Sequence, residues 1–139
     1  SCQDATVPVP ESEERADIVI ADLPCSGLGV IGKKADIKYK MTEQTQKELA
    51  QLQKDILSVV HRYVKSGGTL VYSTCTINED ENMGNVRWFL KEHPEFEPVS
   101  LEGMLCGALK ESVKEGCLQL LPGIHESDGF FIAAFRKKE

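Results

Sequence analysis

The sequence predicts an α/β fold built on a doubly wound sheet, with parallel strands joined by crossover helices and an antiparallel end. Two short apolar segments rich in β-branched residues are typical of buried strands, and a segment with helical spacing follows each of them along the chain. The last third of the chain changes to short strand-like runs separated by turn residues, which favours antiparallel pairing.

The first strand is predicted from ADIVIAD, which begins at Ala16, follows a Pro- and Glu-rich loop and ends before Pro24. A β-branched run with these boundaries indicates a strand buried on both faces. Residues 26–40 are rich in glycine and lysine and lack a sustained period, so we expect a long functional loop there, or a loop plus a short helical turn.

A long helix is predicted over 42–66, where apolar residues recur at helical spacing. Thr42 is its expected N-cap, and Gly67-Gly68 is its expected stop. The second buried strand follows as GTLVYSTC, 68–75.

A second helix is expected after Asn78, which has Glu81 three residues on and so resembles a capping box. This helix closes at His93-Pro94. Three strands are then predicted in the tail: FEPVSL (96–101), GCLQLLPG (116–123) and GFFIAAFRK (129–137).

Composition bounds the class of protein. At 139 residues, with 41% hydrophobic and 27% charged residues, the chain predicts one globular domain. Five widely spaced cysteines are an odd count and indicate free thiols, with neither a disulfide framework nor a zinc pattern. No apolar run approaches the ~20 residues of a membrane span and no signal peptide is evident, so a cytoplasmic location is predicted. A net charge of −6 argues against tight binding of a polyanion such as nucleic acid by these 139 residues alone.

Two cysteines occupy junctions where chemistry is favoured. Cys25 and Cys75 each follow a predicted strand, and ligands of such sheets lie at the carboxyl ends of the strands. Cys75 also precedes a helix N-terminus, whose dipole favours the nucleophilic thiolate. Free cysteines more often pack as small hydrophobic residues. The positions of Cys25 and Cys75 at strand ends make a packing role less probable for these two, but do not exclude it.

Neighbouring polar groups leave alternatives open. The hydroxyls of Ser73, Thr74 and Thr76 would bind a substrate or the thiolate, or else cap the following helix. Asp22 is either a turn residue bonding its own backbone or a carboxylate aimed at a polar ring. No histidine is close in sequence to either cysteine, which disfavours a cysteine-protease dyad.

Two blocks of the sequence then identify a family. DIVIADLPCSGLGVIGKKADIKYK and GGTLVYSTCTINEDEN resemble the Pro-Cys and Ser-Thr-Cys blocks of the Sun (Fmu) type RNA cytosine-5 methyltransferases, which act on small-subunit ribosomal RNA. LQLLPGIHESDGFFIAAFRKK resembles that family's closing block. The resemblance covers nearly the whole chain. It implies that residues 1–139 are one partial catalytic domain, the C-terminal half of a Rossmann-like S-adenosylmethionine (SAM) methyltransferase, without the upstream glycine-rich cofactor loop.

The resemblance also implies a role for each thiol. Cys75 is the expected nucleophile that adds to C6 of cytosine, so that C5 takes a methyl group from SAM. Cys25 is expected to help release the product, as a base or through local rearrangement. Asp22 is expected to bind the cytosine ring and to contribute to the cofactor site.

Further site residues follow from the same resemblance. Pro24, Ser26 and Gly27 are expected to shape a substrate-binding loop, and Thr74 to contact the substrate. Asp4 is the expected acidic contact to the adenine of the cofactor. RNA is the expected partner of the full-length protein, and no metal or membrane is expected.

Other readings remain open at this stage. A non-catalytic Rossmann-like module that binds RNA or a protein would use both thiols structurally. Methylation of an exocyclic nitrogen is disfavoured because Cys25, rather than an aromatic residue, follows the proline. By itself the fragment is expected to be inactive and to bind the cofactor poorly.

Overall fold

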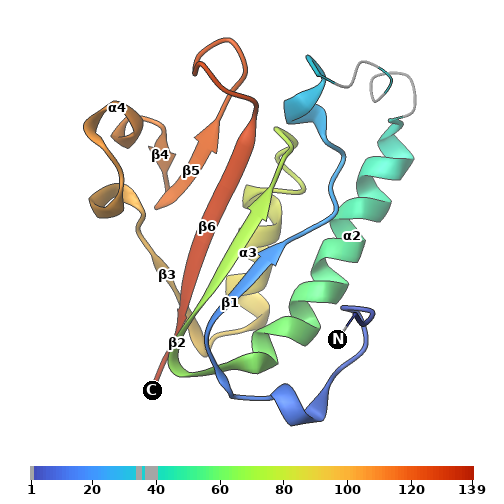
Figure 1. Cartoon of the computed structure of the whole chain (residues 1–139), viewed down its shortest axis with the longest axis vertical. Coiled ribbons are helices and arrows are strands. Elements are labelled where there is room, and N and C mark those ends of the chain that lie inside the picture. Colours follow the sequence, from blue (N-terminus) through green and yellow to red (C-terminus); the bar gives the residue numbers. More distant parts are fainter. Residues whose placement is uncertain (1, 34–35, 37–40) are drawn as a thin grey trace.

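A computed structural model describes residues 2–33, 36 and 41–139. The described residues form one mixed sheet in the order β1-β2-β6-β5-β4, and β3 pairs with β6 outside that path (Figure 1). The strands are β1 (Ala16–Asp22), β2 (Val64–Thr74), β3 (Phe96–Val99), β4 (Val113–Lys114), β5 (Cys117–Leu120) and β6 (Phe130–Lys137). The α-helices are α2 (Glu43–Val60), α3 (Met83–Glu92) and α4 (Gly107–Lys110).

The pairing directions confirm the expected topology. β1 and β2 are parallel, and α2 supplies the crossover between them. β6 runs antiparallel to β2, β3 and β5, which makes the C-terminal end antiparallel. Asp22 pairs with Ser73, so the carboxyl ends of β1 and β2 meet at the same edge of the sheet.

α2 begins where the sequence predicts and ends earlier. The Thr42 hydroxyl caps it by accepting from the Thr45 backbone N–H at 3.1 Å. The helix ends at Val60, and a short 3-10 turn, η3 (His61–Tyr63), leads directly into β2. The predicted end at Ser66 is therefore wrong.

Gly67-Gly68 does not stop the helix, because both glycines lie inside β2. A Cβ on Gly68 would lie 2.9 Å from the Asp17 carbonyl oxygen of β1. Glycine is needed there for a close approach of two strands, at the point where their register shifts.

The second helix also begins later than predicted. Asn82 is the N-cap of α3, and its side chain makes no capping bond. Asn78 instead forms a local turn, with Oδ1 accepting from the Asp80 N–H at 3.1 Å. Glu81 is fully buried and bonds distant segments, so the capping-box prediction is wrong.

Most of the core lies between the sheet and the pair α2 and α3. Leu57, Phe89, Leu70, Tyr72 and Phe135 are each at most 1% exposed there. A second, smaller cluster covers the opposite face of β5 and β6. Residues that share it are Leu101, Leu118 and Ala134, with partly buried neighbours between Val99 and Ile132.

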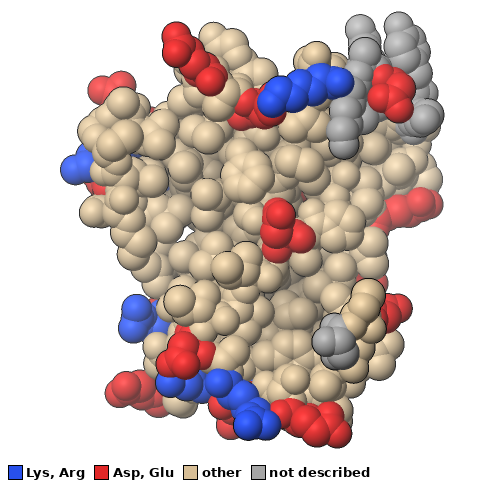
Figure 2. All heavy atoms as spheres, in the orientation of Figure 1, with Lys and Arg blue, Asp and Glu red and all other residues tan. Residues whose placement is uncertain are grey.

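β1 is covered on one face only. Val19 and Ala21 face the helices, whereas Ile18 and Ile20 are 63% and 71% exposed. The prediction of a strand buried on both faces is therefore wrong for the described residues, because nothing among them covers the outer face of β1. Figure 2 shows a broad uncharged surface on this side, with charged residues gathered mainly toward its margins. Within the described ranges, no helix combines the length and apolar character that a membrane crossing requires.

Candidate active site

The two cysteines that follow β1 and β2 meet at one edge of the sheet. The Sγ atoms of Cys25 and Cys75 lie 2.9 Å apart, although the residues are 50 positions apart in sequence. The Cys75 backbone N–H also donates to Cys25 Sγ at 3.2 Å. Because β1 and β2 are parallel neighbours in register, their carboxyl ends deliver both thiols to the same place.

Backbone hydrogen bonds hold the two thiol-bearing loops together. The Gly29 N–H donates to the Cys75 carbonyl at 3.1 Å, and the Gly129 N–H donates to the Gly29 carbonyl at 2.8 Å. A Cβ on Gly129 would lie 2.7 Å from Gly29 Cα. The tail segment before β6 therefore packs against the Cys25 loop so closely that only glycine fits at position 129. Of the predicted loop 26–40, residues 34, 35 and 37–40 lie outside the described residues.

Burial and the neighbouring sulfur raise the pKa of Cys25 to about 12. Burial is the larger cause, and the hydrogen bond with Cys75 adds to it. At neutral pH Cys25 is therefore a neutral thiol, able to donate its proton toward the Cys75 sulfur. A state with both sulfurs negatively charged is disfavoured, since two thiolates at this separation would repel each other.

Asp22 ends β1 with an exposed carboxylate, at the same edge of the sheet as the two thiols. Its Oδ1 accepts from the Ser73 hydroxyl at 2.8 Å, which orients the side chain. A carboxylate has further acceptor capacity, so Asp22 can bind an N–H group of a ligand as well. The bond to Ser73 crosses strands, which is not the local turn bond that the sequence left open.

The predicted substrate loop uses its side chains for structure. Ser26 is 2% exposed and Thr74 is fully buried. The Ser26 hydroxyl bonds Thr76 and Glu81, and the Thr74 hydroxyl donates to Asn82 Oδ1 at 2.6 Å. Both hydroxyls are engaged within the protein, and the contact of Thr74 with substrate stays a prediction.

The remaining loop residues set its shape. Gly27 adopts a left-handed conformation with φ of 69°, which glycine accommodates without strain. Pro24 is exposed, and its carbonyl accepts from Gln53 Nε2 at 2.9 Å. The bond between Gln53 and the Pro24 carbonyl joins the Cys25 loop to α2.

Asp4 is not brought to the thiols. Its carboxylate accepts from the N–H and the hydroxyl of Thr6 at 2.9 and 2.7 Å, and these bonds lower the pKa of this exposed group. In Figure 1 the N-terminus lies lower in the view than the carboxyl end of β1. The contact of Asp4 with the adenine of the cofactor stays a prediction.

Sequence reasoning missed two polar residues that support the site. Gln53 is fully buried and bonds both the Pro24 carbonyl and Glu81. One signal was available: Gln53 interrupts the apolar face that Leu49, Ile56 and Val60 define on α2. Glu81 gave no comparable signal, because Ser26 and Gln53, which it bonds, are distant from it in sequence.

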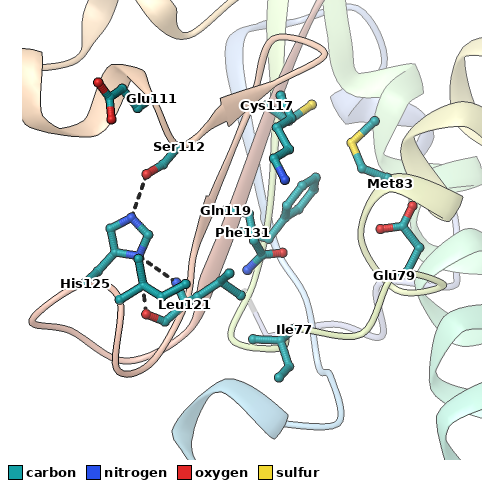
Figure 3. A pocket seen from close by; sticks show the side chains of 12 residues that line it. Ile77, Glu79, Met83, Glu111, Ser112, Cys117, Gln119, Leu121, His125 and Phe131 are labelled. Carbon is teal, nitrogen blue, oxygen red and sulfur yellow. Dashed lines mark hydrogen bonds between the residues drawn. The ribbon is translucent and has the colours of Figure 1, made fainter.

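A cavity of about 390 Å³ lies beside the segment that leaves Cys75 (Figure 3). It contains a serine–histidine pair, with Ser112 Oγ 2.6 Å from His125 Nε2. The Leu121 backbone N–H donates to His125 Nδ1 at 2.9 Å, so Nε2 carries the proton and donates to the serine. This histidine cannot accept the serine proton, and the pair is therefore not a nucleophile–base dyad.

A histidine cluster lies at the opposite edge of the sheet. Donor atoms of His61, His93 and Glu95 lie within 4.8 Å of one another. The two imidazole rings pack against each other at a tilt of 41°, with centroids 4.0 Å apart. Two histidines on one tetrahedral zinc ion require centroids about 5 Å apart, given a Zn–N distance of ~2.1 Å. The observed arrangement is that of packed rings, and burial lowers the pKa of His61 in agreement with a neutral side chain.

A family model and curated relatives match this chain over most of its length. A family model described as 16S rRNA methyltransferase RsmB/F matches residues 2–136. The probable ribosomal RNA small subunit methyltransferase B of Bacillus subtilis is 46% identical over 126 residues, which cover 90% of this chain and 28% of that protein. The ribosomal RNA small subunit methyltransferase F of Cronobacter sakazakii is 40% identical over 125 residues, which cover 89% and 26%.

Solved structures show the same fold. The crystal structure of NSun6 from Pyrococcus horikoshii with SFG matches with a TM-score of 0.80 and 28% identity, covering 99% of this chain and 34% of that one. This likeness confirms the expected Rossmann-like class. The chain thus spans 26–34% of the length of these proteins.

Proposed function

Because the chain belongs to the 16S rRNA methyltransferase RsmB/F family, we propose that it carries the thiol chemistry of an enzyme that methylates C5 of cytosine in small-subunit ribosomal RNA. The observation that carries the proposal is the 2.9 Å separation of Cys25 Sγ and Cys75 Sγ at the carboxyl edge of the sheet. A structural role for either thiol would not require the other beside it.

In the proposed reaction the Cys75 sulfur forms a bond to C6 of cytosine, and the electron pair of the C5–C6 double bond moves toward C5. Bound SAM supplies the methyl group that C5 accepts. The C5 proton then leaves to a base, the double bond re-forms and the S–C6 bond breaks. The electron pair of that bond returns to Cys75.

Cys25 serves as the base of the release step. While Cys75 is free, burial and, to a smaller extent, the hydrogen bond with the Cys75 sulfur hold the pKa of Cys25 at about 12. Once Cys75 is bonded to C6 it is a neutral thioether, and its opposition to a second negative charge is removed. Cys25 then ionises more readily and is adjacent to the adduct.

Asp22 orients the cytosine. Its exposed carboxylate beside the thiols suits the amino group and protonated N3 of the ring, both of which are N–H donors. The target base must be unpaired or flipped out of a duplex, since C6 is inaccessible within the stack.

The described residues fit only part of a cofactor site. Asp22 is the exposed carboxylate at the carboxyl edge, and Asp4 is engaged with Thr6. We propose that other parts of a longer protein complete the SAM site and cover the exposed face of Ile18 and Ile20. The shares of 26–28% of the curated relatives support this, as does the SFG, a SAM analogue, of the NSun6 structure. A cytoplasmic location is proposed because the relatives are named for ribosomal RNA.

Methyl transfer by the intact protein that contains this sequence tests the proposal. Cys75→Ala should abolish transfer of labelled methyl groups to ribosomal RNA, whereas Cys106→Ala, an exposed cysteine outside the site, should leave it unchanged. Normal methylation by Cys75→Ala would exclude the nucleophile and favour a non-catalytic module. The 139-residue chain alone should show negligible transfer, and tight SAM binding by calorimetry would contradict that part.

A further inference from the structure

The carboxylate of Glu81 is fully buried in the turn that precedes α3. Burying a carboxylate is costly unless hydrogen bonds satisfy its oxygens. Glu81 Oε1 accepts from the Ser26 backbone N–H at 2.8 Å and from Gln53 Nε2 at 3.0 Å. Oε2 accepts from the Ser26 hydroxyl at 2.6 Å, from Asn78 Nδ2 at 3.0 Å and from the Thr76 hydroxyl at 3.3 Å.

These five donors are all neutral groups, so the carboxylate acts as a shared acceptor and not as half of an ion pair. The arrangement also differs from a helix cap, because Asn82 occupies the N-cap position of α3. Glu81 therefore does something other than begin its own helix.

Four of the five donors belong to the two loops that carry the thiols, and the fifth, Gln53, lies on α2. Ser26 directly follows Cys25, and Thr76 directly follows Cys75. Their hydroxyls also contact each other, with oxygens 2.7 Å apart. One carboxylate thus joins the residues next to both sulfurs, and a shift of either loop would break at least one of its bonds.

We infer that Glu81 is a positioning residue, whose buried carboxylate holds the Cys25 and Cys75 loops at the separation that the proposed reaction needs. The inference rests on the proposed function for its catalytic consequence, while the geometry of the thiols is measurable on its own. Glu81 touches neither substrate nor cofactor in this account and acts through Ser26 and Thr76.

A conservative substitution isolates the acceptor role. Glu81→Gln keeps the shape of the side chain, but it turns one acceptor oxygen into an NH₂ group that faces existing donors. Asn85→Ala is the matched control, because Asn85 is equally buried and bonds Gln53, Tyr72 and the backbone carbonyl of Glu81, but not the Glu81 carboxylate, Ser26 or Thr76. Both variants remove buried hydrogen bonds, and only the first changes the carboxylate that the two thiol loops share.

Two readouts in the intact protein separate positioning from stability. Under conditions where circular dichroism shows both variants folded, kcat of Glu81→Gln should fall about 10- to 100-fold with little change in KM, the scale of a misplaced catalytic group. The rate at which diamide joins Cys25 to Cys75 should fall in parallel. Asn85→Ala should retain both rates within about threefold.

Each outcome decides the inference. Equal losses in Glu81→Gln and Asn85→Ala, in either rate, would reduce Glu81 to a structural residue. If the unmodified protein transfers no methyl group, the proposed function fails, and the diamide rate still tests the positioning role. If Glu81→Gln does not fold, Ser26→Ala removes the hydroxyl of the same bridge and should slow diamide coupling, and an unchanged rate overturns the inference.

Discussion

Mild oxidation should join Cys25 and Cys75 into a disulfide within the folded chain. The sulfurs lie 2.9 Å apart and a disulfide bond is about 2.05 Å long, so a movement on the order of 1 Å suffices. Diamide supplies the chemistry by accepting two electrons and two protons from the thiols. The bond would consume the proposed nucleophile, so oxidation should also abolish methyl transfer reversibly.

The magnitude follows from the length of chain that the bond encloses. The two cysteines are 50 residues apart. Closing a loop of that size lowers the conformational entropy of the unfolded chain and so raises its free energy by about 4 kcal/mol. Strain in the folded state reduces that figure. With an m-value of about 2 kcal/mol per molar, the urea midpoint should rise by up to about 2 M.

The assay compares urea unfolding of the monomer with and without dithiothreitol, after diamide treatment at low protein concentration. Peptide mapping identifies the joined cysteines. Cys75→Ser cannot form the bond and should show no reductant-dependent shift. Coupling of Cys25 to another cysteine, or oxidation without a rise in the midpoint, would refute the placement of the two thiols.

Three other predictions concern stability. Gly29→Ala should destabilise the fold by about 1–3 kcal/mol in urea unfolding, because the added Cβ would meet the Gly129 carbonyl. Gly32→Ala, with open space at its Cβ, should be near neutral. Equal effects of the two variants would contradict the close approach of Gly29 and Gly129. Phe89→Ala should cost about 3–5 kcal/mol, since the ring is fully buried against other aromatic rings, and a loss below 1 kcal/mol would contradict that packing. The raised pKa of Cys25 stabilises the fold below the unfolded thiol's value near 8.5, and this contribution should be lost as the pH rises from about 9 toward 12. Urea midpoints across that range should fall less in Cys25→Ala, and an equal fall would show that Cys25 contributes nothing.

Features set by local rules were predictable from the sequence. Thr42 caps α2 because a side-chain oxygen at that position meets the first free N–H groups of the helix. Cys25 and Cys75 were expected at one edge because the carboxyl ends of parallel neighbours coincide, and this rule needs no knowledge of side-chain packing.

Features set by distant contacts were not predictable. Glu81 lies three residues after Asn78, and this spacing indicated a capping box, although the Glu81 carboxylate joins Asn78 to the Cys25 loop and to α2 instead of capping a helix. Gly68 follows a helical pattern, which predicts the end of the helix there. In the structure Gly68 instead allows the β1 backbone to approach β2 closely. The outer face of β1 has an apolar sequence, and sequence pattern alone does not reveal whether another element covers it.

A trapped protein–RNA adduct tests the central claim most directly. The intact protein with Cys25→Ala, incubated with SAM and small-subunit ribosomal RNA, should accumulate a covalent complex that survives denaturing gel electrophoresis, because release is blocked after Cys75 has bonded to C6. Adding Cys75→Ala should remove the band. Absence of the adduct, or its persistence without Cys75, would contradict the division of roles between the two thiols.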